Sequence, residues 1–571
     1  MECIYDRVVA IYSRTYQGQL VRCFGTYATL LEEKWHTIQP SLGLHAPKSY
    51  RLVSGIQFDY PELQSNVVRA HEAPLPRGSR VIGVILLSEE PAPATTNFDE
   101  YFCRILIHHL TEPFLLHETS QSTDNSSVAE RLVDLCNTEL LVHPSDSLFE
   151  TTGRNYLIQK ISLFTSRGLP IRMCLPAFPC KSSNLEKVAG VLPDRGEELA
   201  LRRLYSVLRQ IKSIYDPGAK LCIISDGHVF SDCIGVDDDQ VDEYGDKLLE
   251  LNQMIGAQMG QTGQIIFKSL KDILNPSPKE ILGESKARQI TFPALNHYLD
   301  TTISPETEFC RQAMTLGCQP NREFLRSQIQ SQDQAILSLY RGFSRFMLED
   351  LAQHPRSQTM SKSQRKKTAE KSSFEMILRN QAYSNLVELC FPDYVRLSIH
   401  AHINSGPKFG IMLFERAKTR VIDDLHDLES IAKPSHDLLH IPTPWHNCVF
   451  QMTGSDIMYV TKSKVVRGAL DSATVRGCWT QESLSNGLGG YFQIEGPGGV
   501  EKDAVASVLK PVAGSSVSEK DLESQKSIQK SKEGGRSCVT GIFGGIKRLA
   551  QVFKSPSQLY PKSENEKALE C

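Results

Sequence analysis

The chain has 571 residues, of which 40% are hydrophobic and 23% are charged, and its formal net charge is −3. This length allows about two to four domains of ordinary size. The nearly balanced charge argues against a nucleic-acid partner or a membrane-surface partner. The longest apolar runs are strand-sized, so the sequence predicts no transmembrane segment, and the N-terminus lacks a signal-peptide pattern. The 15 cysteines are scattered and form no C-x-x-C pair, which predicts a reducing, cytoplasmic environment.

Composition predicts three regions. Residues 1–95 contain strand-like runs and form an N-terminal extension of unknown role, which ends in a linker rich in Pro and Thr. Residues 98–500 carry the alternating apolar patterns of a folded domain. Residues 501–571 are rich in Ser, Lys and Glu, which predicts a disordered tail. Within it, residues 541–554 predict a short basic amphipathic helix that could contact a membrane surface, a partner or its own domain.

The first half of the central region alternates between helical and strand-like apolar periods. The predicted elements are helix 154–168, strand 170–176, helix 196–215, strand 220–224, helix 237–255 and strand 265–267. Such alternation predicts an α/β fold with a Rossmann-like parallel sheet at its core and right-handed crossovers.

A second helix–strand pair is predicted further along the chain. Ser372 and Glu375 have the spacing of a capping box, which predicts a helix that starts there and ends near residue 389. Residues 394–400 alternate between polar and apolar side chains, as a half-buried strand does. Residues 409–414 are predicted to form the neighbouring strand, across a turn rich in Gly, Pro and Asn.

The most informative stretch is the end of the predicted strand 220–224. There the apolar run breaks into Ser225, Asp226, His228 and Asp232. In open α/β sheets, ligands bind just beyond the carboxyl ends of the strands. Histidine is the natural base near neutral pH, and a neighbouring Asp can orient it and raise its pKa. The same groups could instead bind a metal or cap the next helix.

The strand 170–176 has a similar ending, because its apolar run leads into a loop that contains Lys181 and Ser182. A lysine at the carboxyl end of a strand can bind a phosphate as a point charge. A solvent-exposed lysine is the simpler interpretation. The sequence leaves both open.

A third group of polar residues lies on the strand 394–400. Arg396, Ser398 and His400 are spaced two apart, so they share one face of this strand. Polar groups on a strand that is otherwise buried need a partner, which can be an anionic substrate or an internal salt bridge. His402 would extend this face and give a His-x-His pair that can bind metal, but no third ligand is spaced convincingly.

The nucleotide-binding fingerprints are absent from the sequence. It contains no G-x-G-x-x-G and no G-x-x-x-x-G-K-[ST], so we expect no nucleotide cofactor in the sheet. It also contains no H-x-D, which opens the usual ligand set of non-haem iron oxygenases. We therefore predict a site that uses no cofactor and no metal.

Several ordered segments resemble the pyoverdine/dityrosine biosynthesis family, which includes isocyanide synthases, and the resemblance favours a fungal enzyme of the xanthocillin type. The matching segments are 178–182, 192–200, 225–232, 395–400, 406–409 and 444–446. Two departures adjoin the presumed site and bear on substrate choice rather than on reaction class. Cys180 stands where a larger or aromatic residue is expected, and Ala401-His402 replaces an expected Pro-Ser.

The resemblance implies a concrete reaction. The α-amine of an amino acid, with L-tyrosine preferred, condenses with the C2 ketone of ribulose 5-phosphate. The imine tautomerises, phosphate is expelled, and a retro-aldol-like cleavage leaves C2 on the nitrogen as an isocyanide. The resemblance also implies a downstream oxidase in the same pathway. Two alternatives stay open: an N-formyl-tyrosine synthase of the spore-wall type, and a non-catalytic relative that binds a metal or a partner.

The resemblance also implies roles for individual residues. His228 and His400 would move protons, with Asp226 and Asp232 orienting them. Lys181, Arg396 and Lys408 would hold the phosphate and the amino-acid carboxylate. Further substrate contacts are assigned to Ser182, Ser225, Arg379, Asn380, Trp445 and His446.

Overall fold

The structure is a computed structural model, and it describes the chain in parts. Backbone is described for five strand segments between Val8 and Leu87, and five residues between 97 and 105 are also described. Residues 125–495 follow, apart from 167, 275–276, 319–321, 392–393, 401, 426–427, 429–441 and 481–488. The tail at 501–571, with its predicted amphipathic helix, lies outside the described residues.

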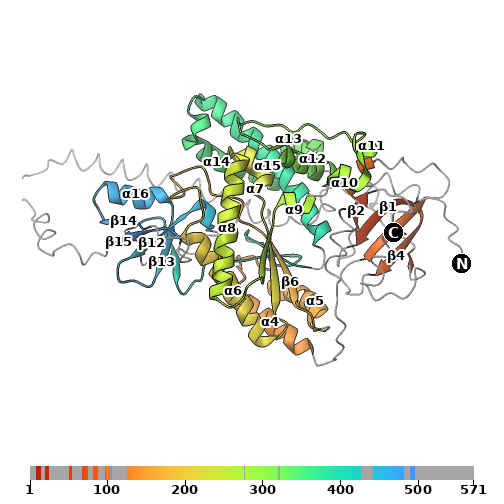
Figure 1. Cartoon of the computed structure of the whole chain (residues 1–571), viewed down its shortest axis with the longest axis horizontal. Helices are drawn as coiled ribbons and strands as arrows, with labels where there is room; N and C mark the ends of the chain where they lie inside the picture. The colour runs from red at the N-terminus through yellow and green to blue at the C-terminus, as the bar shows by residue number, and fades with distance from the viewer. Residues whose placement is uncertain are drawn as a thin grey trace, which may run out of the picture.

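A five-stranded parallel sheet forms the core of the molecule (Figure 1). Its strands are β6 (Ile171–Pro176), β7 (Ala219–Ile224), β8 (Ile265–Lys268), β9 (Val395–Ser398) and β10 (Lys408–Gly410). They lie in the order β8-β7-β6-β9-β10, and every neighbouring pair is parallel. This is the Rossmann order 3-2-1-4-5, so the predicted Rossmann-like parallel sheet is confirmed.

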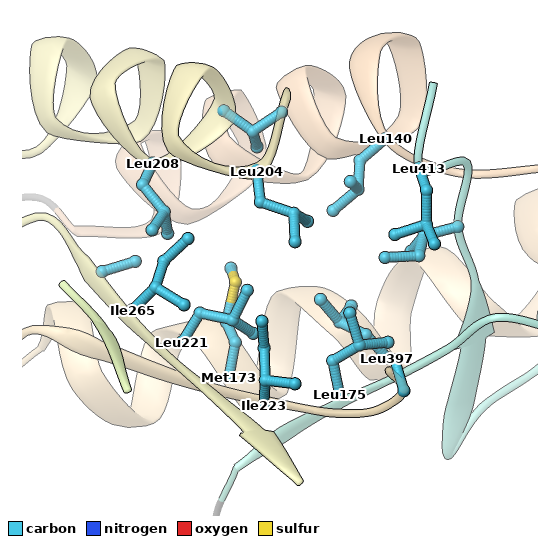
Figure 2. Close-up of a cluster of buried hydrophobic side chains, with 14 of the residues drawn as sticks. Leu140, Met173, Leu175, Leu204, Leu208, Leu221, Ile223, Ile265, Leu397 and Leu413 are labelled. Atoms are coloured by element: carbon cyan, nitrogen blue, oxygen red, sulfur yellow. The ribbon is translucent and has the colours of Figure 1, made fainter. Parts of the chain in front are cut away.

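The two faces of the sheet bury alternate residues of the same strands. Met173 and Leu175 of β6 pack with helices α6 (Arg195–Ile214) and α8 (Asp238–Gln258). Figure 2 shows Leu204 and Leu208 of α6 on one side of this core. Cys174, between the two, enters a separate core with α12 (Pro305–Cys318) and α15 (Lys362–Cys390) on the opposite face. This separation follows from the two-residue period of a strand.

The remaining elements complete the two layers and the flanking regions. The helices not yet given are α4 (Asn125–Glu139), η2 (Phe149–Gly153), α5 (Arg154–Thr165), α7 (Gly227–Ile234), α9 (Leu270–Leu274), α10 (Pro278–Leu282), α11 (Glu284–Ala287), α13 (Arg322–Gln330), α14 (Gln334–Gln353), η3 (Pro355–Ser357), η4 (Pro444–His446) and α16 (Ser463–Asp471). In Figure 1, α12 to α15 gather along one end of the sheet. Among the described residues, none of these helices is both long enough and apolar enough to cross a membrane.

The sequence indicates strand-like runs in residues 1–95, but it does not predict the two further sheets of the structure. A mixed sheet joins β11 (Thr419–Val421), β12 (Cys448–Met452), β13 (Met458–Thr461), β14 (Gly477–Thr480) and β15 (Tyr491–Ile494) in the order β11-β13-β12-β15-β14. An antiparallel sheet lies in the N-terminal extension and joins β1 (Val8–Arg14), β2 (Leu20–Phe24), β3 (Arg51–Val53), β4 (Val67–Pro74) and β5 (Val81–Leu87) in the order β2-β1-β5-β4-β3. Most of these strands are short, so they give weak periodic signals in the sequence.

Helix caps explain one success and one error of the sequence predictions. Helix α6 begins at a capping box in which Asp194 and Glu197 each accept a backbone hydrogen bond, close to the predicted start. The capping box predicted at Ser372 is wrong. The true one uses Ser361, so α15 begins earlier and Ser372 lies inside it. Glu375 instead forms a bidentate salt bridge with Arg322.

The loop after β6 packs directly on the start of α7. At Gly227 a Cβ atom would lie 2.1 Å from the carbonyl oxygen of Pro179 and 2.7 Å from Cγ1 of Val241. Neither contact is possible without a shift of backbone, so only glycine fits there. The loops that follow β6 and β7 are thereby held together.

We predict that Gly227→Ala lowers the free energy of unfolding by about 1–3 kcal/mol, because the added methyl group overpacks this contact. Gly245→Ala is the matched control, since Gly245 lies within α8 and a Cβ there meets no atom within 4 Å. The control should be neutral or slightly stabilising. Denaturant unfolding of both variants measures the difference, and equal stabilities would contradict the close approach.

Candidate active site at the carboxyl edge of the sheet

The strand order reverses between β6 and β9, and this is the point at which open α/β sheets bind ligands. The segment after β7 begins with Ser225 and Asp226. Strand β9 ends at Ser398, and Lys408 begins the neighbouring β10. Polar groups singled out from the sequence therefore follow β7 on one side of β6 and belong to β9 and β10 on its other side.

Two cations lie side by side on β9 and β10. Arg396 and Lys408 are direct register partners. Both contact Ser384 of α15: Lys408 Nζ donates to its hydroxyl at 2.7 Å, and Arg396 donates to its carbonyl oxygen at 3.4 Å. The Arg396 Nε atom is buried without a hydrogen-bond acceptor. A guanidinium that leaves a donor unused can still bind an anion.

Two histidines extend this positive region beyond β9. His402 is buried, and its pKa is held well below its ordinary value by burial and by the charges of Lys408, His400 and Arg396. His400 is exposed. We call these four residues, the cations Arg396 and Lys408 together with the neighbouring His400 and His402, the cation cluster. Its chemistry suits a phosphate or a carboxylate.

The hydroxyl of Ser398 links the backbone of His400 to the buried imidazole of His402. Its oxygen lies 2.9 Å from Nε2 of His402 and accepts a hydrogen bond from the backbone N–H of His400 at 3.2 Å. The predicted His-x-His pair is thus divided, with one exposed ring and one buried ring. Among the described residues, no group of three or more His, Cys, Asp and Glu side chains could hold a metal ion.

The carboxyl of Asp226 has one oxygen without a hydrogen-bond partner in the described part of the chain. Asp226 precedes α7 but makes no side-chain capping bond, and its Oδ1 atom is buried without a partner. Burial raises its pKa to about 7. Burial has the largest effect on the pKa of the Tyr383 phenol and raises it. The charge of Asp226 raises this pKa further and the charge of Arg396 lowers it, so the phenol lies near both groups. Asp226 can therefore gain or lose a proton near neutral pH.

Asp232 has the opposite environment. Arg379 of α15 binds it through two nitrogens, one at 2.8 Å, while His297 Nδ1 lies at 2.8 Å and Arg311 of α12 at 3.5 Å. Burial opposes ionisation, but Arg379, Arg311 and the bond to His297 hold the Asp232 pKa well below its ordinary value. Asp232 and Arg379 are thus bound to each other. The predicted substrate contact of Arg379 has no support in this geometry.

His228 does not contact the two aspartates that were predicted to orient it. Its Nε2 atom lies 3.0 Å from Oδ1 of Asp242 on α8, and Asp242 also binds Lys271 at 2.9 Å. Burial and the charge of Lys271 lower the pKa of His228. The predicted orientation by Asp226 and Asp232 is therefore wrong, because helix α7 turns the ring toward α8 and α9.

Lys181 is fully buried within the protein. Its Nζ donates to Asp194 Oδ2 and to the carbonyl oxygen of Pro444, both at 2.8 Å, and lies 2.9 Å from Glu197 Oε2. Burial is the main reason that the pKa of Glu197 rises to about 7. The conformation seen here therefore uses the ammonium group to anchor the β6 loop, not to face a substrate.

The other residues predicted to contact substrate are Ser182, Ser225, Trp445, His446 and Asn380. The hydroxyl of Ser225 donates to the Phe178 carbonyl at 3.0 Å, and Trp445 packs on the Phe178 ring at 5.2 Å between centroids. Trp445 is buried, as is Ser182, whose N–H donates to the Trp445 carbonyl. His446 packs edge-on against Phe346 of α14. Asn380, one helical turn before Ser384 on α15, is half-buried.

The structure thus brings together the cation cluster, Ser398 and α15, while Lys181, His228 and Asp232 form separate ion networks. The sequence prediction missed Tyr383 and Ser384, which contact the strands from α15. A helical face that carries polar residues at positions 380 and 384 was the available signal.

Comparison with known proteins identifies one family. Residues 161–473 match the family described as Pyoverdine/dityrosine biosynthesis protein. The chain is 45% identical over 344 residues to the spore wall maturation protein DIT1 of Saccharomyces cerevisiae, which covers 60% of this chain and 63% of that protein. It is 30% identical to the L-tryptophan isonitrile synthase AmbI2 of Fischerella ambigua, over 57% of this chain and 83% of that one. It is also 30% identical to the L-tyrosine isonitrile synthase of Xenorhabdus nematophila, over 53% and 74%.

The buried carboxyl of Asp226 gives a prediction for stability. Its pKa is raised in the folded state, so the folded state loses stability as pH rises from about 4 to about 7, where the unfolded carboxyl ionises first. Asp226→Asn should therefore raise the melting temperature by at least about 3 °C at pH 8 and by less at pH 5. Thermal melts at the two pH values measure this.

Asp232→Asn is the control of opposite sign. Because the Asp232 pKa is depressed, its charge stabilises the fold above the unfolded pKa, and the substitution should lower the melting temperature at pH 8. If Asp226→Asn also destabilised the protein at pH 8, the Asp226 carboxylate would have to be paired.

Proposed function

Because the chain belongs to the pyoverdine/dityrosine biosynthesis protein family, we propose that it is an isocyanide synthase that acts on the α-amine of an amino acid with ribulose 5-phosphate as the carbon donor. One observation carries the proposal. The cation cluster lies on and just beyond β9 and β10, and the carboxyl of Asp226 follows β7 on the other side of β6, so an anion-binding group and a proton donor flank the same central strand. L-tyrosine is the preferred amino acid, as in the name of one relative.

The cation cluster supplies the anion contacts that the reaction requires. Both substrates carry an anionic group, a phosphate on the sugar and a carboxylate on the amino acid. In the proposal, Arg396 and Lys408 bind the phosphate, since they are adjacent in register and already share a neutral partner in Ser384. Hydrogen bonds between charged groups are roughly twice as strong as neutral ones, so the phosphate would displace such contacts readily.

Asp226 supplies the proton transfers around the imine. Loss of water from the amine adduct requires a proton donor, and later steps return protons to carbon and oxygen. A carboxyl with a pKa of about 7 is half protonated near neutral pH, which suits an acid that must also be regenerated. The chemistry needs proton transfer and anion binding, and this proposal assigns it no cofactor. A cytoplasmic location and a downstream oxidase remain parts of the same proposal.

A second candidate product is N-formyl-tyrosine. The identity of 45% to a spore wall maturation protein supports this candidate, and the identity of 30% to two isonitrile synthases supports the isocyanide product. The two candidates share every step to the isocyanide, because adding one water to an isocyanide gives the formamide. They therefore make the same demands on the cation cluster and on Asp226. A non-catalytic relative is the third possibility, and it predicts no turnover.

We expect the purified protein to consume ribulose 5-phosphate together with L-tyrosine from a panel of amino acids. Mass spectrometry of rapidly quenched reactions identifies the product, since the formamide exceeds the isocyanide by one water. A control with synthetic isocyanide under the same quench measures spontaneous hydration. Absence of turnover with every amino acid would contradict both enzymatic candidates and favour the non-catalytic one.

We also predict that Arg396→Met and Lys408→Met each raise the KM for ribulose 5-phosphate by about 10- to 100-fold, the usual cost of a lost hydrogen bond to a charged group. Lys220→Met is the matched control. Lys220 is an exposed cation on β7, near the amino end of the same sheet, so its loss should leave the KM unchanged. Equal effects of all three substitutions would show that only overall charge matters.

A further inference from the structure

The proposed reaction requires a base as well as an acid, and the inference that follows rests on the proposed function. Condensation of the amine with the C2 ketone gives an iminium group, and tautomerisation removes a proton from the carbon beside it. The acceptor of that proton must be in its unprotonated, basic form before the step. Asp226 is suited to donate a proton, because burial favours its neutral, protonated form.

Ser398 and His402 form a hydroxyl–imidazole pair in the middle of the cation cluster. The hydroxyl oxygen lies 2.9 Å from His402 Nε2. It also accepts the backbone N–H of His400 at 3.2 Å, and in the His402 tautomer protonated at Nδ1 the hydroxyl donates its own hydrogen to Nε2. A hydroxyl that is oriented by one hydrogen bond and adjacent to a neutral ring nitrogen has the geometry of an activated proton carrier.

The position of the pair places it beside the sugar rather than beside the amino-acid side chain. Ser398 is two residues after Arg396, so both side chains leave the same face of β9. Lys408 lies next to Arg396 in register on β10. If these cations bind the phosphate, the hydroxyl of Ser398 lies next to the carbon chain that carries it.

The charges around His402 also connect its basicity to substrate binding. In the free protein the ring is kept neutral by burial and by Lys408, His400 and Arg396. Lys408 and Arg396 are cationic, and the charge of each opposes protonation of the ring. A bound phosphate dianion would offset part of this positive charge. His402 would then be a stronger base when the phosphosugar is present than when it is absent.

We propose that Ser398 and His402 act as the relay that removes the carbon-bound proton from the imine of the phosphosugar. The C–H bond beside C2 breaks, its electron pair forms the C=C bond of an enamine, and the iminium nitrogen becomes neutral. The proton passes to the Ser398 oxygen while the Ser398 hydrogen passes to Nε2 of His402. The imidazolium returns its proton by the same path in a later step, so no other reactant is consumed.

The simpler interpretation is that this hydrogen bond only holds the loop after β9. Solvent exchange separates the two interpretations. In D₂O with L-tyrosine, the wild-type protein should incorporate deuterium into recovered ribulose 5-phosphate above the level without protein. A loop-holding bond has no reason to affect this exchange once the fold is intact. Imine formation is followed separately by reduction with cyanoborohydride and mass spectrometry of the trapped adduct.

Ser398→Ala and His402→Gln should each reduce product formation and deuterium exchange by at least about 100-fold, the usual contribution of a positioned base. Both should retain the trapped adduct and melt as the wild type does. Ser398→Thr restores the hydroxyl and should restore exchange. His143→Gln is the matched control, because His143 is an exposed histidine whose Nδ1 lies 3.3 Å from the hydroxyl of Ser147.

The outcomes distinguish this proposal from the function it rests on. Wild-type exchange in Ser398→Ala or His402→Gln, with product still formed, overturns the relay alone. Loss of the trapped adduct in both variants also overturns it, since the pair would then act before proton removal. A wild-type protein that gives neither adduct nor product overturns the proposed function itself.

Discussion

The position of helix α15 depends on the buried carboxylate of Asp232. This one side chain on α7 binds Arg379 of α15, lies 3.5 Å from Arg311 of α12 and contacts His297 of the intervening coil at 2.8 Å. Breaking a buried ion pair by removing one partner typically costs about 3–5 kcal/mol. Because α15 also carries Ser384 to the cations of β9 and β10, the geometry of the candidate site follows from this ionic contact.

Several charged residues that suggest catalysis are used by the fold in the same way. Lys181 follows a strand of the sheet, yet it is enclosed by Asp194 and Glu197 of the α6 capping box. Such a cluster fixes the position of the loop after β6 relative to α6. It contributes this specific geometry rather than a net gain in stability. A carboxylate that has two cationic partners is committed to them, whereas Oδ1 of Asp226 is buried without a partner. Absence of a partner therefore separates the candidate acid from the structural ones.

The sequence predicts the parallel sheet well because its central strands are fully buried. The apolar runs at 170–176 and 220–224 correspond to β6 and β7 within one residue at each end. The start of α15 could not be predicted from the spacing of apolar residues, because residues 362–371, the first part of this helix, are mostly exposed and rich in lysine. The site is predictable only in part. The spacing on β9 places Arg396 and Ser398 on one face, but the contact with α15 depends on the tertiary fold.

Burial gives the candidate acid and the candidate base complementary states without any direct contact between them. It raises the pKa of Asp226 to about 7 and lowers that of His402, so near pH 7 the carboxyl is about half protonated and the imidazole lacks the second proton. When the environment raises the pKa of an acid and lowers the pKa of a base, the acid can donate a proton and the base can accept one at the same pH. A phosphate dianion held by Arg396 and Lys408 would raise both pKa values. It would keep the acid protonated while making the base stronger, so the substrate's own charge would complete the site.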